Sequence, residues 1–185
     1  YGPRATINMT WPTVAAKTAK NIDLLTSAQP FSFPNDQALN LIHFSWPNKQ
    51  TLDDRGKIYR RDNPTPTNPD LYVFLSGVLE KLGASHASVL RSFTNELNGL
   101  NTITPWVGFL FNNYSQAQTT YQTLPLSYTA LGLNQLAMRS SWSTDAVWAS
   151  FVSGPYTNNP DSGEQFFDQG SLSIVKGGTP FLVNA

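Results

Sequence analysis

The sequence predicts an α+β fold in which helices come first and strands come second. Apolar residues up to Phe111 recur at the three- and four-residue spacing of helices. After Leu124 they form short runs rich in β-branched and aromatic residues, separated by turn residues. This segregation is typical of two packed units rather than of alternating β-α-β units. We therefore expect a helical part over residues 1–122 and a strand part over residues 123–185.

Prolines and capping residues set the expected helix boundaries. Pro12 is expected in the first turn of the first helix, where a missing N–H costs nothing. The third helix has the clearest signals, because Asn68 caps its start, Pro69 takes its first position and Gly83 follows its end. Five helices are expected, at residues 10–25, 35–44, 69–82, 85–97 and 105–111.

Four strands are expected in the second part, within residues 133–142, 146–154, 171–176 and 179–184. Gly177 and Gly178 lie between the last two and suit a two-residue hairpin turn, which needs positive φ angles. Four strands with apolar residues on both faces cannot bury themselves. We therefore expect the chain to be a fragment, natural or truncated, whose remaining part completes the sheet.

Composition excludes some partners. Twelve basic and twelve acidic residues cancel, so a nucleic-acid partner is not expected. There is no apolar run of membrane-spanning length and no cysteine. The chain is rich in Trp, Tyr and Phe among many amides and hydroxyls, which suits either sugar binding or a packed aromatic core.

Four segments follow one another in a distinctive order. They read "PWVGFLFNN" (105–113), "LPLSY" (124–128), "LGLNQLAMRSSWSTDAVWASFVSGPY" (131–156) and "FFDQGSLSIVKGGTPFLVNA" (166–185). Together they resemble the junction between the helical toroid and the β-sandwich of the heparinase II/III-like polysaccharide lyases. The resemblance implies the C-terminal part of an (α/α) toroid followed by the first strands of an antiparallel β-sandwich.

The resemblance also implies a reaction and a location. Enzymes of this family are secreted or periplasmic and cleave uronate-containing polysaccharides by β-elimination. The reaction needs a group that neutralises the carboxylate, a base and an acid for the leaving oxygen. Alternatively, a protein that kept this scaffold but lost the reaction would be a non-catalytic glycan-binding or surface-assembly protein.

The chain departs from the family pattern where a catalytic histidine is expected. Many members carry His-x-His-x-Asp before the Gln-Gly-Ser strand start, and alignment on Asp168 puts Glu164 and Phe166 at the histidine positions. Asn184 stands where many relatives have an aspartate that helps bind zinc. Because phenylalanine offers no donor and an amide is a poor zinc ligand, we expect no metal and no other cofactor here.

Glu164 has three interpretations. As a general base in place of histidine, it would need a pKa raised by burial or by a neighbouring carboxylate such as Asp161. As a binding group, it would hydrogen-bond sugar hydroxyls together with Gln165. As a solvated loop residue, it would have no chemical role. A catalytic glutamate would also suit a glycoside hydrolase.

His43 lies among apolar residues near a helix end, and is either a buried structural histidine or a catalytic residue of the cleft. Trp46 follows it and is a candidate for stacking on sugar.

A basic loop near residue 60 and the first residues of the chain supply further candidates. Arg55, Tyr59 and Arg60 either hold an acidic glycan or pair with neighbouring aspartates. Tyr1 and Arg4 match, by resemblance, a catalytic tyrosine and a substrate-binding arginine of toroid active sites.

Overall fold

A computed structural model describes residues 2–26, 32–53, 65–112, 117–132, 134–154 and 169–182, leaving out the side chains of residues 2–5, 65 and 66. It confirms a mixed fold of helices and an antiparallel sheet. Contacts divide the chain into a helical unit, Tyr1–Ile42 with Asn68–Thr123, and a sheet unit, His43–Thr67 with Leu124–Ala185. Among the described helices, none is long and apolar enough to cross a membrane.

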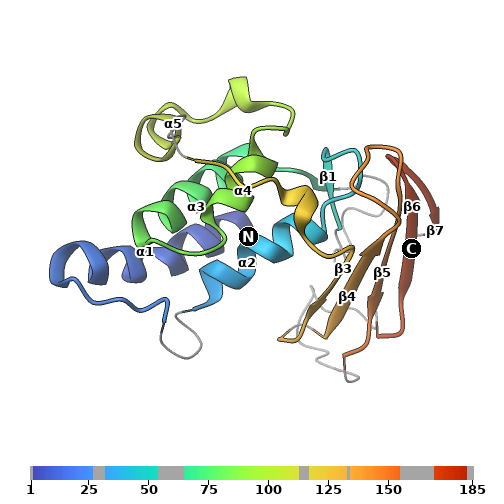
Figure 1. Ribbon diagram of the computed structural model, residues 1–185, viewed down its shortest axis with the longest axis horizontal. Helices are drawn as coiled ribbons and strands as arrows, with labels where there is room; N and C mark the ends of the chain where they lie inside the picture. Colours follow the sequence, from blue (N-terminus) through green and yellow to red (C-terminus); the bar gives the residue numbers. More distant parts are fainter. Residues whose placement is uncertain are drawn as a thin grey trace, which may run out of the picture. The chain divides into compact units, whose positions relative to one another are not determined.

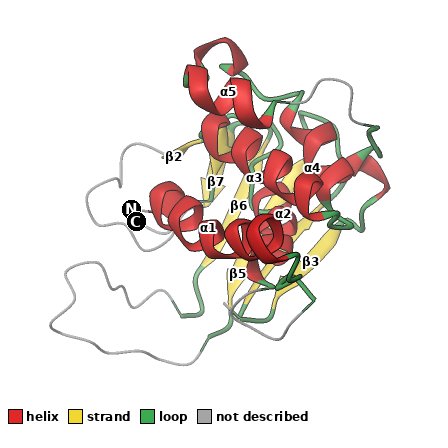
Figure 2. Ribbon diagram, turned by 90° about the vertical axis from the view of Figure 1, so that its left-hand side faces the viewer, coloured by secondary structure: helices red, strands yellow, loops and turns green. Residues whose placement is uncertain are grey.

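The helical unit is organised around one buried helix. Helix α3 packs against α1, α4 and α5, and Figure 2 shows it between α1 and α4. Ten of its residues are buried, including the whole run from Leu71 to Leu79. The helices in this part of the chain are α1 (Gly2–Lys20), α2 (Phe33–His43), α3 (Pro69–Leu82), α4 (Ala87–Thr94) and α5 (Pro105–Phe111), with 3-10 turns at Leu100–Thr102 and Tyr121–Thr123 (Figure 1).

The predicted boundaries of α3 are confirmed. The side chain of Asn68 accepts a hydrogen bond from the N–H of Leu71 at 3.3 Å, and Pro69 takes the first position. Gly83 ends the helix in the left-handed region, with φ of 70°, which glycine adopts without steric cost. Local residue chemistry therefore fixes this central helix at both ends.

The prediction for the first helix was wrong. Helix α1 already begins at Gly2, and Pro12 lies inside it rather than in its first turn. Proline removes one helical hydrogen bond, and this cost must be offset by packing. Trp11, next to the proline, stacks edge-on against Phe74 of α3 with ring centroids 5.4 Å apart. Helix α4 is also shorter than the predicted 85–97.

Helix α5 is held at both ends by charged side chains. At its start, Asp70 accepts hydrogen bonds from the N–H and the hydroxyl of Thr104. At its end, Arg91 is only 1% exposed and donates to the carbonyl of Phe111 at 2.6 Å and to Asn112 at 2.9 Å. Buried arginines are usually stabilised by such partners, because an unpaired buried charge is costly. These contacts fix a helix of only seven residues.

The sheet unit contains a five-stranded antiparallel meander in the order β3-β4-β5-β6-β7. Figure 1 shows these strands side by side in sequence order. Four of them match the predicted strands, and the tight turn at Gly177 and Gly178 is confirmed by the pairing of Lys176 with Thr179. The first strand was missed. The strands are β3 (Ser127–Ala130), β4 (Gln135–Arg139), β5 (Val147–Val152), β6 (Leu172–Lys176) and β7 (Thr179–Leu182).

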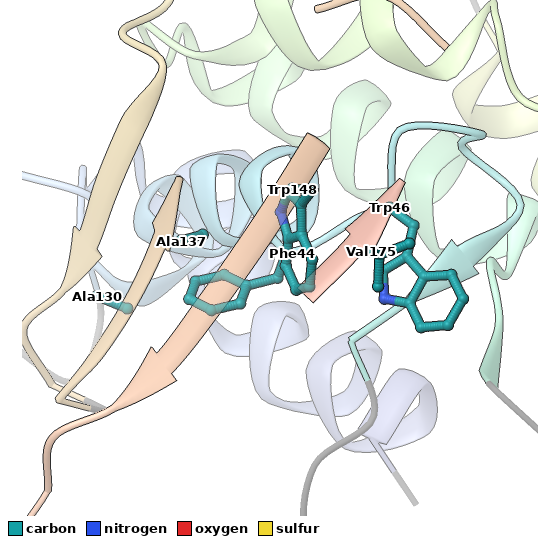
Figure 3. Packing of buried hydrophobic residues seen from close by; sticks show 6 residues of the cluster. All are labelled: Phe44, Trp46, Ala130, Ala137, Trp148 and Val175. Atoms are coloured by element: carbon teal, nitrogen blue, oxygen red, sulfur yellow. The ribbon is translucent and has the colours of Figure 1, made fainter. Parts of the chain in front are cut away.

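The inner face of the sheet is covered by a folded-back segment of residues 43–53. Phe44 and Trp46 pack there against Ala137, Trp148 and Val175 of the strands, as Figure 3 shows. The segment turns back near Lys49 and contains β1 (Thr51–Leu52), which pairs with β2 (Thr65–Pro66).

The outer face of the sheet carries two apolar rows that are exposed or half-buried. Strand register places them on one face, because directly opposed residues point the same way. Phe151 is 36% exposed and Leu182 is 47% exposed. One row contains Leu136, Phe151 and Leu172, and the other contains Met138, Ala149, Ile174 and Leu182.

Close approach of α3 and α5 at Gly77 gives a stability prediction. A Cβ at this position would lie 2.6 Å from the Cβ and 2.7 Å from the Cα of Phe111. Backbone atoms of a braced helix cannot easily move away, so Gly77→Ala should lower the free energy of unfolding by about 1–3 kcal/mol in thermal or urea unfolding.

Gly132→Ala is the matched control, because a Cβ there meets no atom within 4 Å. It should change stability by less than about 0.5 kcal/mol. Equal stability of the two variants would contradict the packing of α5 on α3.

Candidate functional site

One predicted candidate, His43, is the last residue of α2 and lies in a cluster of aromatic side chains. Its side chain is 2% exposed. The imidazole stacks on Tyr128 of β3, with ring centroids 4.8 Å apart and planes 18° from parallel. The indole of Trp142 meets it edge-on at 5.4 Å. A histidine and two aromatic rings from distant parts of the sequence thus form one cluster.

The backbone of His43 holds this cluster to the sheet. Its carbonyl oxygen accepts hydrogen bonds from Nη2 of Arg139 and Nε1 of Trp148, both at 2.9 Å. Arg139 also donates to the carbonyl of Ser45 at 3.1 Å. The guanidinium lies over the ring of Trp142, 4.0 Å from its centroid, which is a cation–π contact.

The cluster keeps His43 uncharged near neutral pH. Burial, and to a smaller extent the positive charge of Arg139, together lower the pKa of its imidazole from 6.5 to about 4. Nδ1 of the ring is buried and has no hydrogen-bond partner among the residues described. A neutral imidazole is able to accept a proton, although this ring lies below the surface.

Tyr128 is the half-buried member of the cluster. Its ring is stacked on His43 and is edge-on to Phe44 at 6.4 Å. His43 packs against this ring, and Tyr128 is more exposed than the buried imidazole, so the phenol is the better placed of the two to meet a ligand.

The structure places Trp46 in the core of the sheet unit. Its side chain is 6% exposed and belongs to the buried cluster on the inner face. Its indole Nε1 is buried without a hydrogen-bond partner in the described part of the chain. Sugar stacking by Trp46 stays a prediction, and it would need the ring to become accessible.

The remaining predicted residues fall outside the description. Arg4 lies in α1, but its side chain is not described. The others lie outside the described residues altogether: Tyr1, Arg55, Tyr59, Arg60, Glu164 and Gln165. Of the predicted set, His43 and Trp46 both belong to the sheet unit.

Sequence reasoning missed three members of the cluster: Tyr128, Arg139 and Trp142. All three occur in the quoted segments "LPLSY" and "MRSSW". Strand alternation was the available signal, because Arg139 lies two residues after the buried Ala137 and must face the same side. Strand periodicity identifies the face of the sheet on which Arg139 lies, but it does not identify the residues that Arg139 contacts on that face.

Within the described ranges, no group of three or more His, Asp or Glu side chains could hold a metal ion. Asp168 and Asn184, where the family pattern has metal-associated residues, lie outside those ranges. The described donors therefore fit no metal centre.

Comparison with models of known protein families found no match for this chain, and a search of curated proteins found no similar sequence.

The lowered pKa of His43 gives a prediction for acid stability. The unfolded chain takes up the proton near pH 6.5, whereas the folded one does so near pH 4. Stability contributed by neutral His43 is therefore full above pH 6.5 and is lost as the pH falls towards 4. The loss should be about 3 kcal/mol, at 1.36 kcal/mol per pKa unit, measured by urea unfolding at several pH values.

His43→Gln should remove this part of the pH dependence, whereas His86→Gln, which replaces the other histidine, should keep it. His43→Phe is a second variant, and the same loss of pH dependence in the free energy of unfolding is expected for it. A pH dependence that is identical in wild type and His43 variants would contradict a buried neutral imidazole.

Proposed function

We propose that this protein acts on a uronate-containing polysaccharide by β-elimination, on a toroid and β-sandwich scaffold outside the cell or in the periplasm. The observation that carries the proposal is the order of the family-like segments. "PWVGFLF" is α5, "LPLSY" leads into β3, and "MRSSW" begins in β4. "SLSIVKGGTPFLV" contains β6, the two-glycine turn and β7.

The outer face of the sheet supports the sandwich part of the proposal. Its two apolar rows leave Met138, Phe151 and Leu172 between 36% and 41% exposed. Soluble proteins rarely leave a wide apolar face open, and sheets commonly bury such faces against a second sheet about 10 Å away. We propose that further polypeptide of the same protein supplies this second layer.

Tyr128 is the residue that we assign to proton transfer in the described region. A tyrosine is able to move the protons of an elimination, and its half-buried ring is fixed by His43 and Phe44. His43 is a positioning residue in this scheme, since its ring is buried. Tyr1 and Glu164 stay proposed catalytic residues.

Binding of the uronate carboxylate is assigned to residues outside the described side chains. Arginine is the better bidentate partner for a carboxylate. The proposed binding residues are Arg4, Arg55, Tyr59, Arg60 and Gln165, with Trp46 as a stacking residue.

One observation favours a second function, glycan binding without cleavage. His43 and Trp46, two of the residues selected for chemistry, are 2% and 6% exposed and pack in a core. Residues that pack in this way keep a scaffold folded whether or not it reacts. A glycoside hydrolase that uses Glu164 has no supporting contact in the described region.

Incubation with alginate, hyaluronan, chondroitin sulfate and heparin separates these functions. Elimination leaves an unsaturated sugar that absorbs in the ultraviolet, whereas hydrolysis gives new reducing ends without this absorbance. We expect ultraviolet absorbance to rise with at least one polymer. Tyr128→Phe should lower kcat by about 100-fold or more, because it removes the phenolic proton.

Tyr121→Phe is the matched control. Tyr121 is buried in the helical unit, and its hydroxyl donates to Glu96 at 2.8 Å. It should leave kcat unchanged. Retained polymer binding without any product would support glycan binding instead, and loss of both binding and product would refute both functions.

A further inference from the structure

The helical unit has a groove between α3 and α5, and neither His43 nor Trp46, the predicted residues with described side chains, lines it. Its volume is about 290 Å³, and its walls are Gly77, Glu80, Lys81, Leu110 and Phe111. Ligand pockets usually measure about 300–1,000 Å³, so this groove matches the lower end of that range. Its size suits one small ring rather than a long segment.

Two exposed aromatic side chains contact Phe111, one of the residues that line the groove. Phe111 contacts Trp11 with ring centroids 6.1 Å apart and Trp106 with ring centroids 6.3 Å apart. Trp11 is 39% exposed and Trp106 is 47% exposed. Phe109, on the same short helix, is 89% exposed. Large aromatic side chains are rarely left in water without a reason when several of them gather in one place.

Two polar side chains accompany these rings. The ammonium group of Lys81 lies 5.9 Å from the ring centroid of Phe111. Glu80, the preceding residue, also lines the groove. An ammonium donates hydrogen bonds and a carboxylate accepts them, so the groove offers both kinds of partner.

The groove has a fixed shape. Its floor, Phe111, is 4% exposed and belongs to the core of the helical unit. A side chain at Gly77 would strike this residue, so glycine keeps the groove from being filled. The hydrogen bonds from Thr104 to Asp70 and from Arg91 to Phe111 hold both ends of α5. Such preorganisation lowers the entropy that a ligand must lose on binding.

We propose that this groove is a sugar-binding subsite that takes one pyranose ring of a glycan. The apolar face of the ring stacks on the aromatic edge formed by Trp106 and Phe111. Its hydroxyls donate to Glu80 and accept from Lys81. The inference rests on the proposed function for the choice of a glycan, but it requires no cleavage of that glycan.

The mixture of groups favours a sugar over other ligands. A membrane surface attracts clusters of several basic residues, whereas this groove is lined by one basic residue, Lys81, and one acidic residue, Glu80. A pyranose has apolar C–H faces and a rim of hydroxyls, so it uses the aromatic and the polar walls together.

Indole N–H signals in a proton–nitrogen correlation spectrum test the proposal directly. The chain has five tryptophans. Titration with cellohexaose and with an alginate hexasaccharide should shift the signals of Trp11 and Trp106. The signal of Trp148, which is 0% exposed in the sheet unit, should stay unchanged.

Trp106→Ala should weaken hexasaccharide binding about tenfold, the equivalent of losing one aromatic stacking contact. Lys81→Met should weaken it several-fold. Phe181→Ala is the matched control, because Phe181 is a 70% exposed aromatic on β7 of the other unit, and its removal should leave binding unchanged.

Three results would overturn the subsite: no shift of either indole, equal weakening by Trp106→Ala and Phe181→Ala, or shifts that depend on protein concentration without sugar. Product formation with unmoved indole signals would refute the subsite alone. Indole shifts without product would support the subsite and refute the proposed reaction alone.

Discussion

The sheet unit depends on one carbonyl oxygen, that of His43, which accepts hydrogen bonds from Arg139 and Trp148. Both donors are buried, and a buried donor without an acceptor costs roughly 1–3 kcal/mol, more when it is charged. The two bonds hold the start of the 43–53 segment on the inner face, where Phe44 and Trp46 complete the core. The uncharged state of the His43 ring follows, because the segment places it between Tyr128 and Trp142 beside a cation.

In the helical unit, side-chain hydrogen bonds to the backbone likewise hold α5 in place. This short helix would not form alone, since isolated helices need about 12–15 residues even to be marginal. Asp70 and Arg91 satisfy backbone groups near its two ends, and its buried residues Val107 and Phe111 join the core around α3. Once α5 is fixed, its other residues project exposed aromatic rings beside the groove. In both units, a buried charged side chain that bonds to backbone positions the residues to which we assign function.

Local chemistry made much of the fold predictable from the sequence. Asn68, Pro69 and Gly83 determine α3 by their own conformational preferences, and the glycine pair determines the last hairpin. The start of α1 was not predictable, because packing of Trp11 on Phe74 outweighs the usual preference of Pro12 for a first turn. The cluster around His43 could not be predicted from the sequence for another reason. Its partners are about a hundred residues away in sequence, and periodicity gives no register between such segments.

The candidate site depends on His43 being a buried, neutral imidazole that packs against Tyr128 and Trp142. A nuclear magnetic resonance titration of its ring measures this directly, with the ring signals assigned by comparison with His43→Gln. We expect constant ring shifts from neutral pH down to about pH 5, with a midpoint near 4. A midpoint at 6.5 or above would show an accessible or charge-paired histidine and would contradict a buried, neutral imidazole.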